Sequence, residues 1–256
     1  MDKKLQQLLN TKAAQYNTPD FIAVDPISIP HRFTLQQDIE IAGFFASIFA
    51  WGNRTIIINK TTELMRLMDN RPHQFIQQHQ PKDLKAFLHF KHRTFNTTDL
   101  LYFIHFLQTH YAQHPTLETA FSQWMQPGDE TVEGALKGFH TYFFSLPDAP
   151  ARTRKHIATP ARGATCKRLC MFLRWMVRRD SCGVDFGFWK NISPAQLVCP
   201  VDVHVARVAR RLGLLHENVL NWRAALELTN RLKQLDPKDP AKYDFALFGL
   251  GVMEKF

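Results

Sequence analysis

The chain has 256 residues, of which 45% are hydrophobic and 21% are charged, a composition that can bury a sizeable core and excludes an intrinsically disordered protein. Its 32 lysine and arginine residues outnumber 23 acidic residues, and the net charge of +9 favours a polyanionic partner. No apolar run approaches the roughly 18 residues of a membrane span and the first residues lack the apolar core of a signal peptide, so we expect a cytoplasmic protein with no membrane partner.

The first 35 residues are predicted to form an N-terminal helix and an irregular arm. The helix is expected over residues 1–15, which are mostly polar. Three prolines follow, and they are expected to break any helix in the arm: Pro19, Pro26 and Pro30. Residues 36–253 are then predicted to form one domain.

Apolar residues recur at helical spacing through this domain, whereas no long alternating run predicts a sheet. Proline and glycine mark the turns between the helices. The helices expected in chain order cover residues 35–50, 55–68, 99–111, 117–125, 132–146, 152–158, 164–178, 202–212, 219–235 and 242–252. The predicted fold class is therefore all-α.

The stretch from Thr159 to Arg207 holds the residues with candidate chemistry. Lys167 falls in the first turn of its predicted helix, where the positive end of the helix dipole disfavours an ammonium group. Arg162 and Arg168 add like charge, and a lysine nucleophile needs the free amine that both effects favour. The alternative for Lys167 is a solvated lysine that binds phosphate.

Asp202 directly precedes the next predicted helix of this stretch, whose apolar positions include Val205 and Val208. An aspartate at that place is a normal helix N-cap. Capping is compatible with a chemical role, because a capping carboxylate is held rigidly at the start of its helix. The residues alone therefore leave both roles open.

Positive charge gathers in the same part of the chain, because no acidic residue occurs from Arg152 to Arg179. The periodicity of an α-helix places a set of basic residues on one face of the lysine helix and apolar residues on the opposite face. The face expected to be basic carries Lys167, Met171, Arg174 and Arg178.

The chain resembles the helix-hairpin-helix DNA glycosylase superfamily in its turn at 159–163, its lysine helix and its segment Asp202-Val-His204-Val-Ala-Arg207-Val208. In this superfamily, which includes endonuclease III and the oxoguanine glycosylases, a hairpin precedes a catalytic lysine and a catalytic aspartate opens a later helix. Lys167 and Asp202 fall on these positions, 35 residues apart. That separation and the segment Lys167-Arg-Leu-Cys-Met-Phe-Leu-Arg look closer to the archaeal oxoguanine glycosylases. The whole chain also looks like a bacterial family of unassigned function.

The resemblance implies two helical lobes with an active-site cleft between them and a helix-hairpin-helix motif over residues 150–179. It further implies a base-excision repair glycosylase that extrudes a damaged nucleotide from double-stranded DNA, and we expect a monomer. Lys167 would displace the base by attack on C1′, while Asp202 would help to deprotonate the lysine and stabilise the cationic sugar. The resulting Schiff base permits AP-lyase activity, and the archaeal likeness suggests oxidised guanine. His204 is expected to orient or cap rather than to react.

The predicted DNA contacts come from the hairpin, the helices that carry the pair, and an early turn; they are Arg162, Gly163, Arg168, Arg174, Arg207, Asn53 and Arg54. Three aromatic residues are candidates for the base pocket: Trp51 from the early turn, and Phe188 and Trp189 from the loop over 180–199. Core packing is an equal alternative for any one aromatic of that loop.

The chain also departs from the superfamily pattern. The turn Thr159-Pro-Ala-Arg-Gly163 has one glycine where Leu-Pro-Gly-Val-Gly has two, so Arg162 could contact a phosphate directly. No cysteine follows Cys199 and the cysteine spacing fits no metal pattern, so neither an iron–sulfur cluster nor another metal or cofactor is expected. Three alternatives stay open: a non-catalytic DNA-binding helical protein that keeps the fold, an RNA- or nucleotide-directed enzyme, and a helical interaction protein in which the Lys167–Asp202 pairing is a coincidence.

Overall fold

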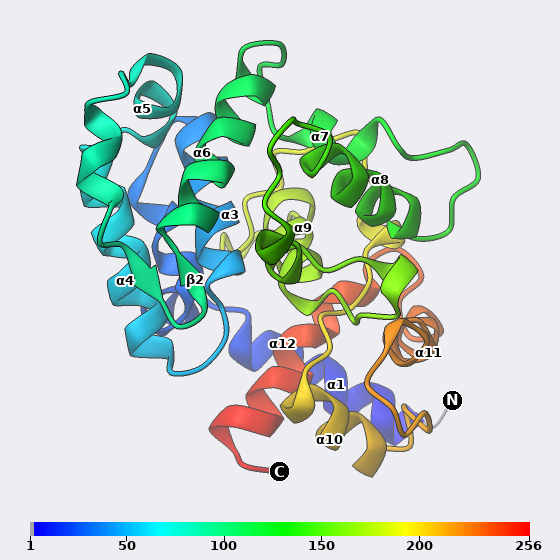
Figure 1. Ribbon diagram of the computed structural model, residues 1–256. Coiled ribbons are helices and arrows are strands. Elements are labelled where there is room, and N and C mark those ends of the chain that lie inside the picture. Colours follow the sequence, from blue (N-terminus) through cyan, green and yellow to red (C-terminus); the bar gives the residue numbers. More distant parts are fainter. Residues whose placement is uncertain (1–2) are drawn as a thin grey trace. The chain divides into compact units, whose positions relative to one another are not determined.

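The computed structural model describes residues 3–256 and confirms the all-α prediction (Figure 1). Within these residues, β structure is limited to a hairpin of β1 (Lys91–His92) and β2 (Phe95–Asn96). The α-helices are α1 (Lys3–Tyr16), α2 (Pro19–Val24), α3 (Gln36–Ile48), α4 (Arg54–Leu67), α5 (Pro72–Gln78), α6 (Thr97–Tyr111), α7 (Glu118–Ser122), α8 (Glu133–Phe143), α9 (Lys167–Val177), α10 (Val203–Arg211), α11 (Trp222–Lys233) and α12 (Tyr243–Phe248). Over the described range, no helix is long and apolar enough to cross a membrane.

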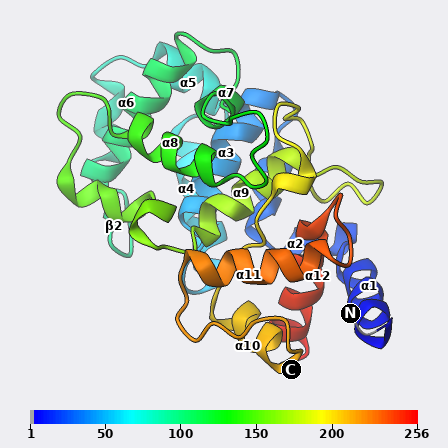
Figure 2. The same cartoon turned by 90° about the vertical axis from the view of Figure 1, so that its right-hand side faces the viewer.

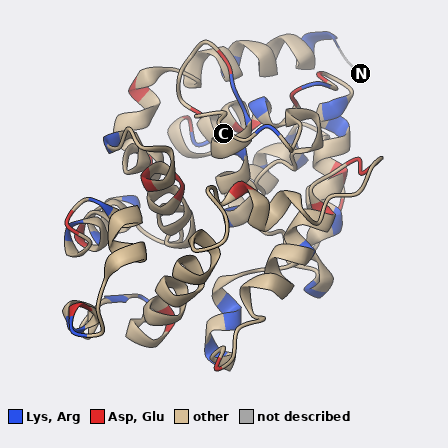
Figure 3. Cartoon of the chain, turned by 90° about the horizontal axis from the view of Figure 1, so that it is seen from above, with Lys and Arg blue, Asp and Glu red and all other residues tan. Residues whose placement is uncertain are grey.

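The chain divides into two compact units. The first unit comprises the residues up to Ala23 together with Met125–Lys137 and Ala158–Phe256, and the second comprises Val24–Trp124 and Gly138–Ile157. Lysine and arginine positions are spread along the ribbon rather than confined to one segment (Figure 3). The predicted single domain over residues 36–253 stays a prediction.

The predicted irregular arm is wrong in part, because each of its prolines begins a helical turn. Pro19 is the first residue of α2, while Pro26 and Pro30 open the 3₁₀ helices Pro26–Ser28 and Pro30–Arg32. Proline is favoured at the first helical position, since the N–H that it lacks would have no acceptor within the helix there. The rule that proline breaks a helix applies to helix interiors and not to these positions.

A cluster of phenylalanines forms the core of the second unit. Phe44 on α3 stacks on Phe103 of α6 with ring centroids 5.6 Å apart, and it meets Phe139 of α8 edge-on at 5.9 Å. All three rings are fully buried. Aromatic pairs in these geometries stabilise a core beyond the area that they bury.

In the first unit, α9 runs through the interior, because every residue from Leu169 to Val177 is buried. The N-terminal helix α1 packs along α12, and α12 contacts α10 (Figures 1 and 2). The π-helix Gly249–Met253 follows α12 and approaches α10 closely: a Cβ on Gly251 would lie 3.1 Å from Val208 Cγ2. The Nη2 of Arg207 also donates a 2.7 Å hydrogen bond to the Gly251 carbonyl. These contacts hold α10 against the C-terminal helical segment.

The predicted helix-hairpin-helix motif is not confirmed. Its first helix, expected over 152–158, is instead the 3₁₀ helix Ala151–His156. Its second helix, expected from residue 164, begins at Lys167. The motif therefore lacks a first α-helix, although the turn and the lysine helix are present.

Candidate active site

Lys167 and Asp202 lie together in the first unit, each at the start of a helix. Lys167 is the first residue of α9, and Asp202 is the N-cap of α10. The Lys167 Nζ is 3.6 Å from Asp202 Oδ2, and the two side chains are 27% and 26% exposed. The distance is that of an ion pair rather than a short hydrogen bond. Because both groups remain partly exposed, an external ligand can reach them.

The Asp202 carboxylate uses its two oxygens differently. Its Oδ1 accepts hydrogen bonds from the backbone N–H groups of His204 at 2.9 Å and Val205 at 3.0 Å, as an N-cap does. Its Oδ2 is the atom nearest Lys167. The cap thus fixes the carboxylate and leaves one oxygen for the lysine. His204 itself is exposed and supplies its backbone N–H to the cap.

The chain enters α9 through two residues with left-handed backbone conformation. Gly163, with a φ of 72°, follows the 3₁₀ helix Pro160–Arg162, and its carbonyl accepts a 2.9 Å hydrogen bond from the Trp222 N–H. Cys166, the N-cap of α9, has a φ of 54°. A right-handed helix cannot include a left-handed residue, so α9 begins after Cys166. This start makes Lys167 the first helical residue.

Replacing Cys166 by valine is expected to lower the free energy of unfolding by about 1–3 kcal/mol more than replacing Cys170 by valine. A β-branched side chain strongly disfavours the left-handed region that Cys166 occupies, whereas Cys170 is helical. Both thiols are buried, so the two variants change the core alike. Urea unfolding of the two variants measures the difference, and equal losses would contradict the strain argument.

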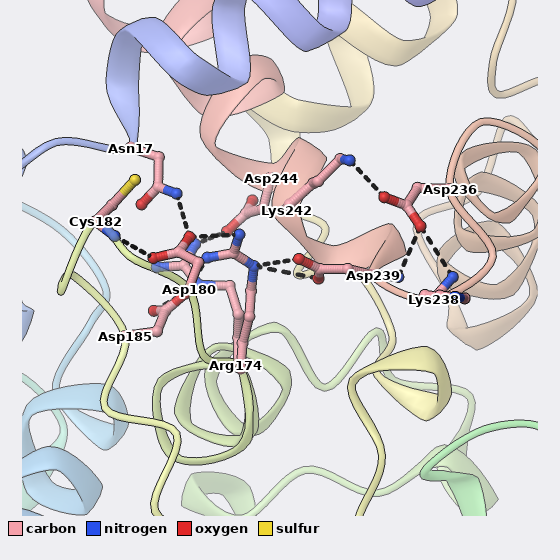
Figure 4. A network of polar contacts seen from close by, with 11 residues as sticks. Asn17, Arg174, Asp180, Cys182, Asp185, Asp236, Lys238, Asp239, Lys242 and Asp244 are labelled. Atoms are coloured by element: carbon pink, nitrogen blue, oxygen red, sulfur yellow. Dashed lines mark hydrogen bonds and ion pairs between the residues drawn. The ribbon is translucent and has the colours of Figure 1, made fainter.

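Arg174 of α9 (Figure 4) and Arg178, the residue that follows this helix, are paired inside the first unit, and each is only 3% exposed. Arg174 Nε lies 3.2 Å from Asp185 Oδ1, and Arg174 Nη1 contacts the Asp244 carboxylate. Arg178 pairs at 2.7, 3.1 and 2.9 Å with Asp180, Asp185 and Asp239. The predictions that α9 has an exposed basic face and that Arg174 contacts DNA are therefore wrong. A buried guanidinium needs carboxylate partners, and the interior of the unit provides them.

Asp244 on α12 interacts electrostatically with the candidate pair and was not among the predicted site residues. Its carboxylate is nearly fully buried, and burial raises the pKa of Asp244 to about 6 although the positive charges of Arg174 and Lys167 oppose the rise. The negative charge of Asp202 adds to it. Asp244 is thus coupled electrostatically to both members of the candidate pair. An aspartate among the apolar residues of Asp244-Phe-Ala-Leu-Phe was the available signal, because buried carboxylates are rarely without a partner.

A family model described as "Protein of unknown function (DUF2400)" matches residues 25–253. The chain belongs to the DUF2400 family. The matched range includes Lys167, Asp202 and Asp244, so the pair and its buried neighbour all fall within the family region. No curated protein and no solved structure matches the chain.

Four predicted DNA contacts of the DUF2400 protein lie on the segments that carry the pair. Arg162 and Gly163 are exposed in the turn before α9. Arg207 is exposed on α10, although part of its guanidinium binds the π-helix. Arg168 is partly exposed, and burial lowers the pKa of Arg168 to about 10, so it stays a cation at neutral pH. All four remain candidates for phosphate contacts.

The early-turn candidates belong to the second unit of the DUF2400 protein. Asn53 is exposed and caps α4, where its Oδ1 accepts a 3.1 Å hydrogen bond from the Ile56 N–H. Arg54 is the first residue of that helix. Trp51 is partly exposed and lies edge-on to His92 with ring centroids 4.7 Å apart. The predicted roles of Trp51, Asn53 and Arg54 at DNA stay predictions.

The two aromatic candidates of the 180–199 loop differ in exposure. Trp189 is 1% exposed and meets Phe172 edge-on at 5.3 Å, so the prediction that it lines a base pocket is wrong and it is a core residue. Phe188 is 36% exposed, and its ring stacks on that of Phe186 with the ring centroids 5.6 Å apart. Its predicted role in the base pocket stays a prediction.

Among residues 3–256 of the DUF2400 protein, no group of three or more His, Cys, Asp or Glu side chains is placed to bind a metal ion. The cysteine next to Lys167 in the chain, Cys166, is buried. Burial raises the pKa of Cys166 to about 12, so this thiol is neutral at physiological pH. The reactive groups that the structure brings together at the site are the Lys167 amine and the Asp202 carboxylate.

Proposed function

We propose that this DUF2400 protein is a DNA glycosylase with AP-lyase activity that acts on damaged bases in double-stranded DNA. The observation that carries the proposal is the 3.6 Å approach of Lys167 Nζ to Asp202 Oδ2. A partly exposed amine beside a rigidly held carboxylate gives a nucleophile and an acceptor for its proton. The resemblance of both segments to helix-hairpin-helix glycosylases supports the choice of substrate, with oxidised guanine as the suggested lesion. We expect the protein to act as a monomer in the cytoplasm.

In the proposed reaction, the neutral Lys167 amine attacks C1′ of an extruded nucleotide. The Nζ–C1′ bond forms while the bond between C1′ and the base nitrogen breaks, and the base leaves with the bonding electrons and takes up a proton. Asp202 Oδ2 accepts a proton from Nζ and stabilises the positive charge that develops on the sugar. Opening of the sugar ring then gives a protonated imine, from which β-elimination of the 3′ phosphate breaks the strand.

The Lys167–Asp202 contact contributes little to the stability of the fold. Ion pairs between partly exposed side chains are worth about 0–1 kcal/mol. Asp202 already stabilises α10 through Oδ1, which does not require the lysine. A chemical use for Oδ2 and Nζ therefore explains their juxtaposition better than a structural one.

Binding of the substrate is proposed to use arginines on the segments that carry the pair, namely Arg162, Arg168 and Arg207. The net charge of +9 supports a polyanionic ligand. Each phosphate contact releases counterions, so binding to duplex DNA is expected to weaken steeply as the salt concentration rises.

Covalent trapping tests the proposal. Duplex oligonucleotides that carry 8-oxoguanine, uracil or an abasic site are incubated with the protein and borohydride, which reduces any imine to a stable adduct. The wild type is expected to form an adduct on at least one substrate. Lys167→Gln should form none, whereas Lys190→Gln, which changes an exposed lysine of the 180–199 loop, should behave as the wild type. An adduct in Lys167→Gln would exclude Lys167 as the nucleophile. Salt-dependent DNA binding with no adduct on any substrate would instead support the non-catalytic DNA-binding alternative.

A further inference from the structure

Two basic residues on one face of α9, Lys167 and Arg174, each contact an aspartate that belongs to another helix. Lys167 and Arg174 are seven residues apart, which is close to two helical turns, so they share a face. Lys167 approaches Asp202 at the start of α10, and Arg174 contacts Asp244 of α12. Because α10 and α12 contact each other, the two pairs belong to one packed group of helices.

The surroundings of Asp244 make its charge matter to the site. The carboxylate is nearly fully buried, and charges in a buried environment are poorly screened. Three parts of the first unit contribute the titratable and charged groups that act on the Asp244 carboxylate: α9 with Lys167, Cys170 and Arg174, the 180–199 loop with Asp185 and Cys199, and the start of α10 with Asp202. In this set Lys167 and Arg174 are the cations.

We propose that Asp244 is a positioning residue for Lys167: it holds the Arg174 guanidinium on the face of α9 that carries the lysine, and its negative charge sets how readily Lys167 gives up its proton. This inference deepens the proposed function and rests on it for its catalytic consequence. The electrostatic coupling itself does not depend on the identity of the substrate.

The physical basis is a balance of charges. An ionised Asp244 offsets the positive charge of Arg174 and so favours the ammonium form of Lys167. When Asp244 is neutral, Arg174 is less compensated and favours the free amine that attacks C1′. Burial raises the pKa of Asp244 to about 6, so the charge of Asp244 changes as the pH passes through about 6.

The test measures the ionisation of Lys167 directly and without DNA. The lysines are methylated reductively with a ¹³C label, the Lys167 signal is assigned by its loss in Lys167→Gln, and its chemical shift is followed against pH. Asp244→Asn is expected to move the midpoint of the Lys167 titration to lower pH by roughly 0.5–1 unit, because one nearby negative charge is lost. Asp244→Glu, which keeps the charge, should bring the midpoint back towards the wild-type position.

Asp239→Asn is the matched control. Asp239 belongs to the same buried network (Figure 4), but it pairs with Arg178 at 2.9 Å rather than with Arg174. Its substitution should leave the Lys167 midpoint unchanged. An unchanged midpoint in Asp244→Asn, or an equal shift in Asp239→Asn, overturns the inference.

A second measurement covers the case in which Asp244→Asn does not fold. In a His204→Gln background, which removes the nearest imidazole along the chain, the Lys167 signal should show an additional inflection near pH 6 from the ionisation of Asp244. A single inflection overturns the inference. The two proposals also fail separately: absence of a trapped adduct in the wild type counts against the glycosylase function, whereas an Asp244-independent Lys167 titration counts against the coupling alone.

Discussion

Asp202→Asn is expected to slow base removal by about 10²–10⁴-fold while changing the free energy of unfolding by less than about 0.5 kcal/mol. Asparagine is as good an N-cap as aspartate, so its Oδ1 can still accept from the His204 and Val205 N–H groups. It cannot, however, take a proton from Lys167. Single-turnover kinetics on the substrate that traps best, together with urea unfolding, measure the two effects separately.

Asp202→Ala provides the comparison, because alanine removes both the cap and the carboxylate. It is expected to lose about 1 kcal/mol of stability in addition to activity. Asp202→Ser, which restores a capping oxygen without a carboxylate, should recover the stability but not the rate. Should Asp202→Asn react as fast as the wild type, the carboxylate has only its capping role.

Arg174→Met is expected to lower the free energy of unfolding by about 3–5 kcal/mol, because it leaves the buried carboxylate of Asp244 without its arginine partner. Arg174 is 3% exposed and contacts both Asp185 and Asp244. Removing one member of a buried ion pair costs more than the pair contributes, since the remaining charge is neither solvated nor neutralised. Urea unfolding at neutral pH measures the loss.

The same variant should respond to acid in a predictable direction. Burial raises the pKa of Asp244 from 3.8 to about 6 in the folded protein, so the folded state binds this proton more tightly than the unfolded state. Protonation of Asp244 therefore stabilises the fold fully below pH 3.8, and this stabilisation is lost as the pH rises through about 6. Without Arg174 the folded-state pKa of Asp244 is expected to rise further, since that cation lowers it. The stability of Arg174→Met relative to the wild type should therefore improve as the pH falls from 7 towards 5.

Two further variants test the explanation. Arg179→Met changes the exposed residue next to Arg178 and is expected to alter stability by less than about 0.5 kcal/mol. The double variant Arg174→Met/Asp244→Asn should be more stable than Arg174→Met alone, because it removes a charge that would otherwise be buried without compensation. If Arg174→Met is no less stable than Arg179→Met, the buried network does not support the fold.

The parts of the site that local patterns specify were predictable from the sequence. Asp202 precedes the periodic residues Val205 and Val208, and that pattern placed the start of α10 within one residue. The prediction that Lys167 and Asp202 lie together came from the resemblance of their two segments to a known family, and the structure places Lys167 Nζ 3.6 Å from Asp202 Oδ2. Their role in catalysis stays a prediction, because proximity alone does not show a reaction.

Long-range pairing was not predictable. The helical periodicity of α9 placed Arg174 with Lys167 on one face, but its acidic partners Asp185 and Asp244 lie 11 and 70 residues further along the chain. A pattern read within one helix cannot show them, so a buried basic residue was assigned to the surface. The conformation of Cys166 is a similar case: glycine usually marks a left-handed residue, and the nearest glycine is three positions earlier, at Gly163.

The packing of α1 against α12 has a consequence for the order in which the protein can fold during synthesis. The main neighbour of α1 is α12, which lies at the other end of the described residues. The two segments pack closely, because a Cβ added to Gly249, directly after α12, would lie only 2.0 Å from the ring of Tyr16 on α1. Contacts this distant in sequence close a long loop and form slowly. The second unit, drawn mostly from the continuous stretch Val24–Trp124, can assemble on the ribosome while the first unit is incomplete. Because α12 contacts α10 and carries Asp244, the segments around Lys167 and Asp202 reach their native packing only after α12 has been synthesised.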